Sequence, residues 1–169
     1  MDEVVALYTP GDLSGTVVGV ATRGEVRARN LPHAATAVLL RDQDGRVYVH
    51  RRTNTKDVYP GLHDAFAGGV VAAGEAPDVA AVRELAEELG VRDCPLTPRL
   101  RYWYTDEATS YLAFVYEATY DVDRNGPIVH QASEVAEGWW MDWDALLALL
   151  DDPTWPFVPD GRAALEQLR

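Results

Sequence analysis

The sequence contains a single cysteine, Cys94, among its 169 residues. One cysteine can neither form an internal disulfide nor supply the thiolates of a cysteine-based zinc site, so both features are excluded. The N-terminus is acidic where a secretory signal would be basic. Apolar runs such as residues 145–150 are far shorter than the ~20 residues that a membrane-spanning helix needs. We therefore expect a soluble, cytoplasmic protein that does not associate with membranes.

Basic residues are also scarce. The chain has 15 Lys and Arg against 27 Asp and Glu, which gives a formal net charge of −12 at pH 7. Such a charge repels a phosphate polymer, so the composition argues against binding to nucleic acid. If the ligand is a small anion, another positive charge has to attract it, and a divalent cation is the obvious source.

The length and the 47% content of hydrophobic residues fit one globular domain over residues 1–169. No repeat, low-complexity tract or linker interrupts it. Turn residues and apolar periodicity predict strands at residues 4–8, 16–20, 35–40, 46–50, 64–71 (broken at Gly68-Gly69), 100–104, 111–120 and 137–141. They predict helices at residues 22–29, 76–89, from 142 or 144 to 150, and 161–168. This α/β mixture indicates helices sandwiched around a mixed sheet.

The helix at residues 76–89 has the strongest signals. Pro77 suits the first helical position, and Gly90 suits the end. Its apolar positions predict one buried stripe, made by Val79, Val82, Leu85, Ala86 and Leu89. At 100° per residue, three glutamates fall together on the opposite face: Glu84, Glu87 and Glu88.

Two interpretations of these glutamates compete. An acidic helix face that simply stays in solvent is the ordinary outcome for a charge cluster. Alternatively, clustered carboxylates suit a hard cation such as Mg²⁺ or Mn²⁺, which takes oxygen ligands and bridges to phosphates.

The surrounding sequence favours the cation site. Residues 69–91 read GVVAAGEAPDVAAVRELAEELGV. The segment resembles the Nudix box at every defined position, and nine fixed positions over 23 residues make the pattern specific. The resemblance implies a Nudix α/β/α sandwich with a mixed sheet and a catalytic loop-helix. It also implies an enzyme that hydrolyses a diphosphate linked to another moiety, with water activated by a divalent cation.

By the same resemblance, Glu84, Glu87 and Glu88 bind Mg²⁺ or Mn²⁺. The structural positions of the box are Gly69, Glu75 and Gly90. Glu75 is expected to pair with Arg83, which belongs to the catalytic machinery by orienting the carboxylates. The general base is open: Glu87 or Glu84 within the helix, or Glu134 or Glu137 from a later loop, although exposed loop acids are commonly just solvated.

Outside the box, a dense basic cluster contains Arg51, Arg52 and Lys56. We interpret Arg52 and Lys56 as candidate phosphate contacts, with solubilising charge at a strand end as the alternative. The aromatic residues in the predicted strands and beside them are a stacking platform or, more commonly, core: Tyr102, Trp103, Tyr104, Trp139, Trp140 and Trp143.

The flanking residues resemble one branch of the family, the Nudix hydrolases related to isopentenyl-diphosphate isomerase. The residues that carry this likeness are Asn30 to His33, Arg51, Arg52, Lys56, Pro60, Gly61, Asp64 and residues 155–159. An isomerase itself is the weaker alternative, because the strand before the box lacks its cysteine, no histidine follows, and Thr109 and Tyr111 stand where its glutamate pair would be. His33 is a relic of that metal site or a packed structural residue.

A third hypothesis is a non-catalytic module that binds diphosphates. The group beyond the diphosphate, the number of metal ions and the oligomeric state, a homodimer included, are left open by the sequence.

Overall fold

The structure, a computed structural model, describes residues 2–169. Its helices are α1 (Arg23–Arg29), α2 (Pro77–Leu89), α3 (Val122–Asn125), α4 (Trp143–Leu150) and α5 (Pro159–Leu168). Its strands are β1 (Val4–Tyr8), β2 (Val17–Thr22), β3 (His33–Arg41), β4 (Val47–Arg52), β5 (His63–Asp64), β6 (Phe66–Ala67), β7 (Leu96–Thr105), β8 (Ser110–Thr119) and β9 (Val135–Met141). The predicted elements are all present with shifted ends, except that residues 64–71 form the short β5 and β6 instead of one strand. Only α3 was not expected.

The main sheet is mixed. Its strands run in the order β5-β4-β3-β8-β7, with β6 paired to β3 and β9 paired to β4. Strands β3 and β8 are parallel, with His33 opposite Tyr111, whereas β7 and β8 are antiparallel. The hairpin turn between β3 and β4 forms as expected, because the amide of Asp42 donates to the carbonyl of Arg46 (2.9 Å).

Beyond that turn, β3 and β4 separate. Their only paired residues are Arg41 and Val47, within the part of the chain that the structure describes. Further along, β6 pairs with β3 while β5 and β9 pair with β4. The two strands therefore diverge like a wedge, and the segment that leads into the glycine pair at 68–69 lies in the opening.

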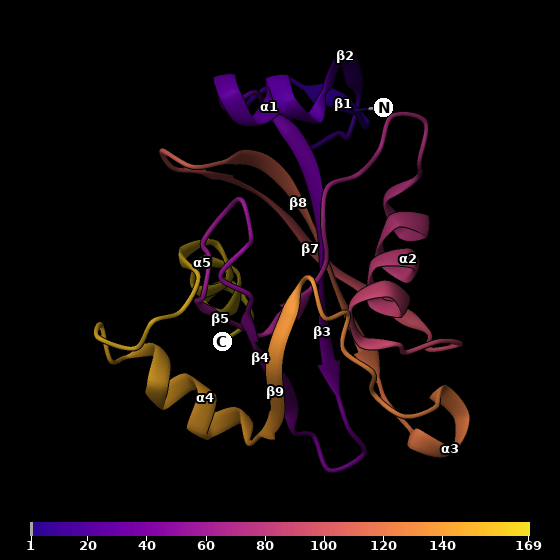
Figure 1. Cartoon of the computed structure of the whole chain (residues 1–169), viewed down its shortest axis with the longest axis vertical. Coiled ribbons are helices and arrows are strands. Elements are labelled where there is room, and N and C mark those ends of the chain that lie inside the picture. The colour runs from indigo at the N-terminus through magenta and orange to yellow at the C-terminus, as the bar shows by residue number, and fades with distance from the viewer. Residues whose placement is uncertain (1) are drawn as a thin grey trace.

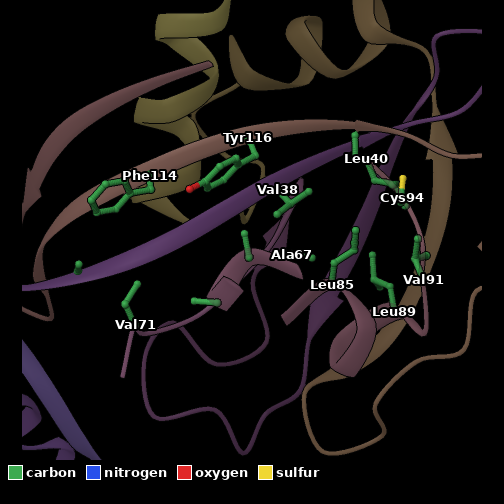
Figure 2. Close-up of a cluster of buried hydrophobic side chains, with 14 of the residues drawn as sticks. Val38, Leu40, Ala67, Val71, Leu85, Leu89, Val91, Cys94, Phe114 and Tyr116 are labelled. Carbon is green, nitrogen blue, oxygen red and sulfur yellow. The ribbon is translucent and has the colours of Figure 1, made fainter. Parts of the chain in front are cut away.

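Helices cover both faces of this sheet. In Figure 1, α2 lies on one side of the central strands and α4 and α5 lie on the other. Alternate residues of β8 serve the two layers: Leu112, Phe114 and Tyr116 belong to the cluster that contains α2, whereas Ala113 and Val115 belong to the cluster beneath α4 and α5. Figure 2 shows the first cluster, with side chains from α2 packed near those of β3 and β8. The predicted α/β/α sandwich is confirmed.

The apolar stripe expected on α2 is partly wrong. Leu85 and Leu89 are buried as predicted, but Val79 and Val82 are 59% and 54% exposed. The helix instead turns Ala80 and Ala81 toward the sheet. Small side chains allow a close approach of helix and sheet, so two alanines pack together with Leu85 and Leu89 while the two valines stay exposed.

The N-terminal part lies at one end of the sandwich. Strands β1 and β2 form a separate antiparallel pair, and α1 follows directly from β2. Thr22 caps α1: its side chain accepts from the amide of Glu25, and the Glu25 carboxylate accepts from the amide of Thr22. This cap fixes where α1 begins. Within residues 2–169, no helix combines the length and apolar character that crossing a membrane requires.

Candidate active site

Arg83 is the organising side chain of the loop-helix. Its Nε and Nη2 donate to the two carboxylate oxygens of Glu75 at 2.8 and 3.0 Å. Its Nη1 donates to Glu84 at 2.9 Å and to Glu87 at 3.2 Å. Glu75 in turn accepts from the amide of Ala72, which closes the loop before the helix. The expected pairing of Glu75 with Arg83 is confirmed, and the guanidinium offsets the repulsion between neighbouring carboxylates.

Gly68 and Gly69 bring backbone and carboxylates together. The amide of Gly68 donates to Glu88 at 3.3 Å. A side chain at Gly69 would lie 2.5 Å from a carboxylate oxygen of Glu84, and one at Gly68 would lie 1.9 Å from the carbonyl oxygen of Thr36. Neither glycine has a positive φ. Both are therefore required by close approach, one to strand β3 and the other to Glu84, rather than by backbone conformation.

The three helix glutamates differ in their surroundings. Glu88 is 6% exposed and the side chain of Glu84 is 14% exposed, but the side chain of Glu87 is 47% exposed. The sequence placed all three on the face opposite the apolar stripe, so the burial of Glu88 among the core-facing residues of α2 is a correction. Burial raises the pKa of Glu84, and burial together with the charge of Glu84 raises the pKa of Glu88 to about 8.

This donor set fits a hard divalent cation. It offers only carboxylate oxygens. The carboxylates of Glu84 and Glu88 are desolvated and repel each other, and a bound cation relieves this repulsion. The carboxylates do not all point to one place, however, because Arg83 holds Glu84 and Glu87 while Glu88 reaches Gly68. Accordingly, no group of three or more His, Cys, Asp or Glu side chains in residues 2–169 is arranged so that it could hold a metal ion.

Lys56 and Glu134 are brought together beside this helix. Their side chains form an ion pair. Burial lowers the pKa of Lys56, and the charge of Glu88 offsets part of this effect. The loop that carries Glu134 is fixed against the end of α2, since the amide of Gln131 donates to the carbonyl of Glu88 (2.9 Å). Thus the structure places the later-loop acid and the predicted phosphate contact next to each other and near the helix glutamates.

Arg52 is only partly available for a ligand. Its Nη2 donates to the carbonyl of Val58 at 2.7 Å and its Nε to that of Tyr59 at 3.3 Å, while its Nη1 lies 3.8 Å from a carboxylate oxygen of Asp64. Arg52 therefore also holds the loop after β4. Its neighbour Arg51 points elsewhere and pairs with Glu137 across β4 and β9 (3.1 Å). Glu137 thus behaves as an ordinary surface acid.

A cavity of about 110 Å³ opens in the wedge between β3 and β4 and extends toward α1 and α5. Gly68 and Gly69 form part of its wall, so it adjoins the carboxylates of α2. Arg52 and Lys56 also line it. The cavity therefore connects the glycine loop, the basic side chains and the face of the sheet covered by α5.

Several sequence alternatives are settled by packing. His33 is 2% exposed, its Nδ1 lies 2.9 Å from the carbonyl oxygen of Leu31, and burial lowers its pKa to about 4, as expected of a packed structural histidine. The aromatic residues considered for stacking pack against the two main clusters. One of them, Tyr102, also lines the cavity.

The structure adds site residues that sequence reasoning missed. Asp160 was not singled out at all, and Asp64 only through the likeness of the flanking segments. Tyr111 was considered only because it stands where an isomerase would have a glutamate. All three line the cavity. Asp64 lies before the box, Tyr111 in β8 and Asp160 in the last helix. No local sequence pattern marks them as site residues, because only the tertiary fold brings them together.

A helix that holds buried carboxylates against a glycine loop, with lysine and arginine at an adjoining cavity, defines a site for the chemistry of phosphate anhydrides. The NUDIX domain family matches residues 31–161. The chain belongs to the Nudix family and is by class a Nudix hydrolase, an enzyme of diphosphate bonds.

Individual relatives agree. An uncharacterized Nudix hydrolase of Rhodococcus erythropolis is 47% identical over 97% of this chain and 90% of its own length. One from Streptomyces coelicolor is 41% identical over 99% and 89%. Among solved structures, a Deinococcus radiodurans protein has a TM-score of 0.78 at 23% identity, with 99% of this chain and 100% of that one covered. The NUDIX domain of Shewanella oneidensis NrtR, complexed with ADP-ribose, has a TM-score of 0.63 at 19% identity, covering 88% and 97%. The last two likenesses concern the fold alone.

Proposed function

We propose that this chain is a pyrophosphohydrolase that depends on Mg²⁺ or Mn²⁺ and splits a diphosphate linked to another moiety. The observation that carries the proposal is the pair of desolvated carboxylates, Glu84 and Glu88, held against Gly68 and Gly69 at the edge of a cavity. Retaining two repelling acids there costs stability, and a cation that binds them offsets this cost.

In this proposal Glu84, Glu87 and Glu88 are the cation ligands. A divalent cation, when bound, neutralises the diphosphate and makes a water molecule more acidic. Arg83 and Glu75 keep the carboxylates in position through the contacts described above. Glu87, the exposed member, would hold the cation in place of its present contact with Arg83.

Lys56 and Glu134 take two further roles, phosphate binding and general base catalysis. The diphosphate competes with Glu134 for the ammonium of Lys56, and Arg52 supports the same phosphate. Release from Lys56 leaves the Glu134 carboxylate as the general base. Water loses its proton to Glu134 as its oxygen bonds to phosphorus, the bridging P–O bond breaks, and two phosphate-bearing fragments leave.

The test is hydrolysis of a panel that contains ADP-ribose, a nucleoside diphosphate sugar and isopentenyl diphosphate, with Mg²⁺, with Mn²⁺ and with chelator. We expect cleavage into two phosphate-bearing fragments only with metal. Glu84→Gln, Glu87→Gln and Glu88→Gln should each reduce turnover by about 100-fold or more, since each removes several kcal/mol of charge stabilisation. Glu166→Gln, which loses only a surface contact with Arg169, is the matched control.

Metal binding is measured separately by the melting temperature. Mn²⁺ should raise it in the wild type and in Glu166→Gln but not in Glu84→Gln or Glu88→Gln. A rearranged product without fragments would instead support the isomerase alternative. Binding without turnover would support the non-catalytic one.

A further inference from the structure

Two partly buried acids line the cavity on the side of α5. Asp64 is the last residue of β5, and Asp160 lies in the first turn of α5. The two come together because α5 packs over the opening between β3 and β4: a side chain at Gly161 would lie 3.2 Å from a carboxylate oxygen of Asp64. Both acids line the cavity, together with Tyr102 and Tyr111.

The two acids differ in how far their hydrogen bonds are satisfied, and Asp64 is the less satisfied of the two. Its Oδ1 accepts from the amide of Phe66 at 3.0 Å, but its Oδ2 is 3.8 Å from Arg52, which is beyond hydrogen-bond length. Asp160 is better satisfied, since its Oδ1 accepts from the amide of Gly161 (2.8 Å) and its Oδ2 from the hydroxyl of Tyr111 (2.6 Å). Asp64 is thus the acid with an acceptor to offer.

Keeping two acids here is costly for the folded protein. Burial and the charge of Asp160 raise the pKa of Asp64 to about 7, and burial raises the pKa of Asp160. Arg52 lies within ion-pair distance of Asp64 (3.8 Å), and it also donates to the carbonyls of Val58 and Tyr59. Packing alone would be served better by apolar residues at both positions. A ligand that supplies hydrogen-bond donors accounts for the arrangement.

Basic and acidic side chains are concentrated on different sides of the cavity. Arg23, Arg27 and Lys56 line it on the side of α1 and of the loop after β4, whereas Asp64 and Asp160 line it on the side of α5. Arg52 lies near both Lys56 and Asp64. A ligand whose anionic part lies at the basic side, next to Gly69, therefore directs its other part toward the acid pair. An alkyl chain at that end would cover the carboxylates without satisfying them.

We propose that Asp64, supported by Asp160 and Tyr111, is a specificity-determining residue that accepts a hydrogen bond from a hydroxyl or amino group on the part of the substrate beyond the diphosphate. This inference rests on the proposed function for the position of the diphosphate. It excludes a substrate whose remaining part is purely hydrocarbon, because a site built to accept a donor rejects the analogue that lacks it.

The test compares two probes by calorimetry without metal: ADP-ribose, which carries many donors, and isopentenyl diphosphate, which has none on its chain. Wild type should bind ADP-ribose more tightly. In Asp64→Asn the carbonyl keeps the contact with Phe66 and the amino group faces the cavity, so an acceptor becomes a donor. We expect affinity for ADP-ribose to fall about tenfold or more, with affinity for isopentenyl diphosphate changed less than about twofold.

Asp57→Asn is the matched control. Asp57 also lines the cavity, but at the basic side, where it accepts from Arg27 (3.0 Å). It should leave the ratio of the two affinities unchanged, and Asp160→Asn should lower this ratio as Asp64→Asn does. Equal affinity of wild type for both probes, no binding of ADP-ribose, or an equal loss for both in Asp64→Asn would overturn the inference. If no member of the hydrolysis panel is cleaved with metal, the proposed function fails, while these affinities still decide the role of Asp64.

Discussion

Replacing each glycine of the pair by alanine should damage the protein in different ways. At Gly68 the new methyl group would lie 1.9 Å from the carbonyl oxygen of Thr36, which is backbone of strand β3. Real Cβ atoms do not approach closer than about 3.0 Å, so strand and loop have to move apart by about 1 Å. Overpacking of this kind costs roughly 1–3 kcal/mol, and a rigid backbone neighbour places Gly68→Ala at the upper end.

At Gly69 the methyl group meets the end of a side chain instead. The three closest atoms are the carboxylate atoms of Glu84, at 2.5 to 3.0 Å. Glu84 can rotate away at little cost in stability, but its carboxylate then leaves the position beside the loop. We therefore expect Gly69→Ala to keep most of its stability and to lose about 10-fold to 100-fold in metal-dependent turnover, as when a ligand is misplaced.

The assay combines calorimetric melting with turnover at saturating metal. For a chain of this length, 1 kcal/mol shifts the melting temperature by about 2–4 °C, so Gly68→Ala should melt roughly 5–10 °C below wild type and Gly69→Ala within about 3 °C of it. Gly45→Ala, in the β3–β4 turn, has no atom near the added methyl group and reports the cost of its positive φ alone. Full activity of Gly69→Ala, or equal melting of the two variants, would refute the reasoning.

Two further predictions concern α2. In metal-free protein, raising the pH from about 5 to 8 should destabilise wild type more than Glu88→Gln: the unfolded chain releases the Glu88 proton near pH 4.3, whereas the folded chain keeps it up to about 8. Melting curves at several pH values measure this, and parallel pH dependences would contradict it. Arg83→Lys should lower turnover about 10-fold or more, because one ammonium cannot replace the fork that contacts Glu75 and Glu84; kinetics on the cleaved diphosphate test it, and unchanged turnover would argue against the orienting role.

Local patterns in the sequence predicted the elements well. The helix start at Pro77 and its end at Gly90 depend on the conformational preferences of single residues, and the structure has both. The pairing of Glu75 with Arg83 follows from the loop that returns the chain to its own helix. These features involve residues near one another along the chain, so a sequence pattern contains the necessary information.

Features that depend on which side of α2 meets the sheet were predicted less well. Val79 and Val82 were expected in the buried stripe because they are apolar, and Glu88 was expected on the opposite face. In the structure both valines are exposed and Glu88 is buried. The helix rotates so that its small residues pack, and a charged residue is buried as a consequence. Hydrophobicity alone cannot express the gain from close approach or the demands of a binding site.

Residues far apart in sequence were the hardest to connect. Lys56 and Glu134 were each proposed for the site, but their ion pair was not foreseen. Asp64 and Asp160 meet only because α5 returns across the opening between β3 and β4. Nothing in either segment indicates the other.

The parallel pairing of β3 with β8 has a consequence for biosynthesis. His33 lies opposite Tyr111 and Arg41 opposite Thr119, so the central strand lacks its neighbour until most of the chain has left the ribosome. Until then the inner face of α2, though locally helical, has only part of its layer to pack on. We expect nascent chains that stop before β8 to be captured by chaperones and to resist proteases poorly, and protection to appear abruptly once β8 is available.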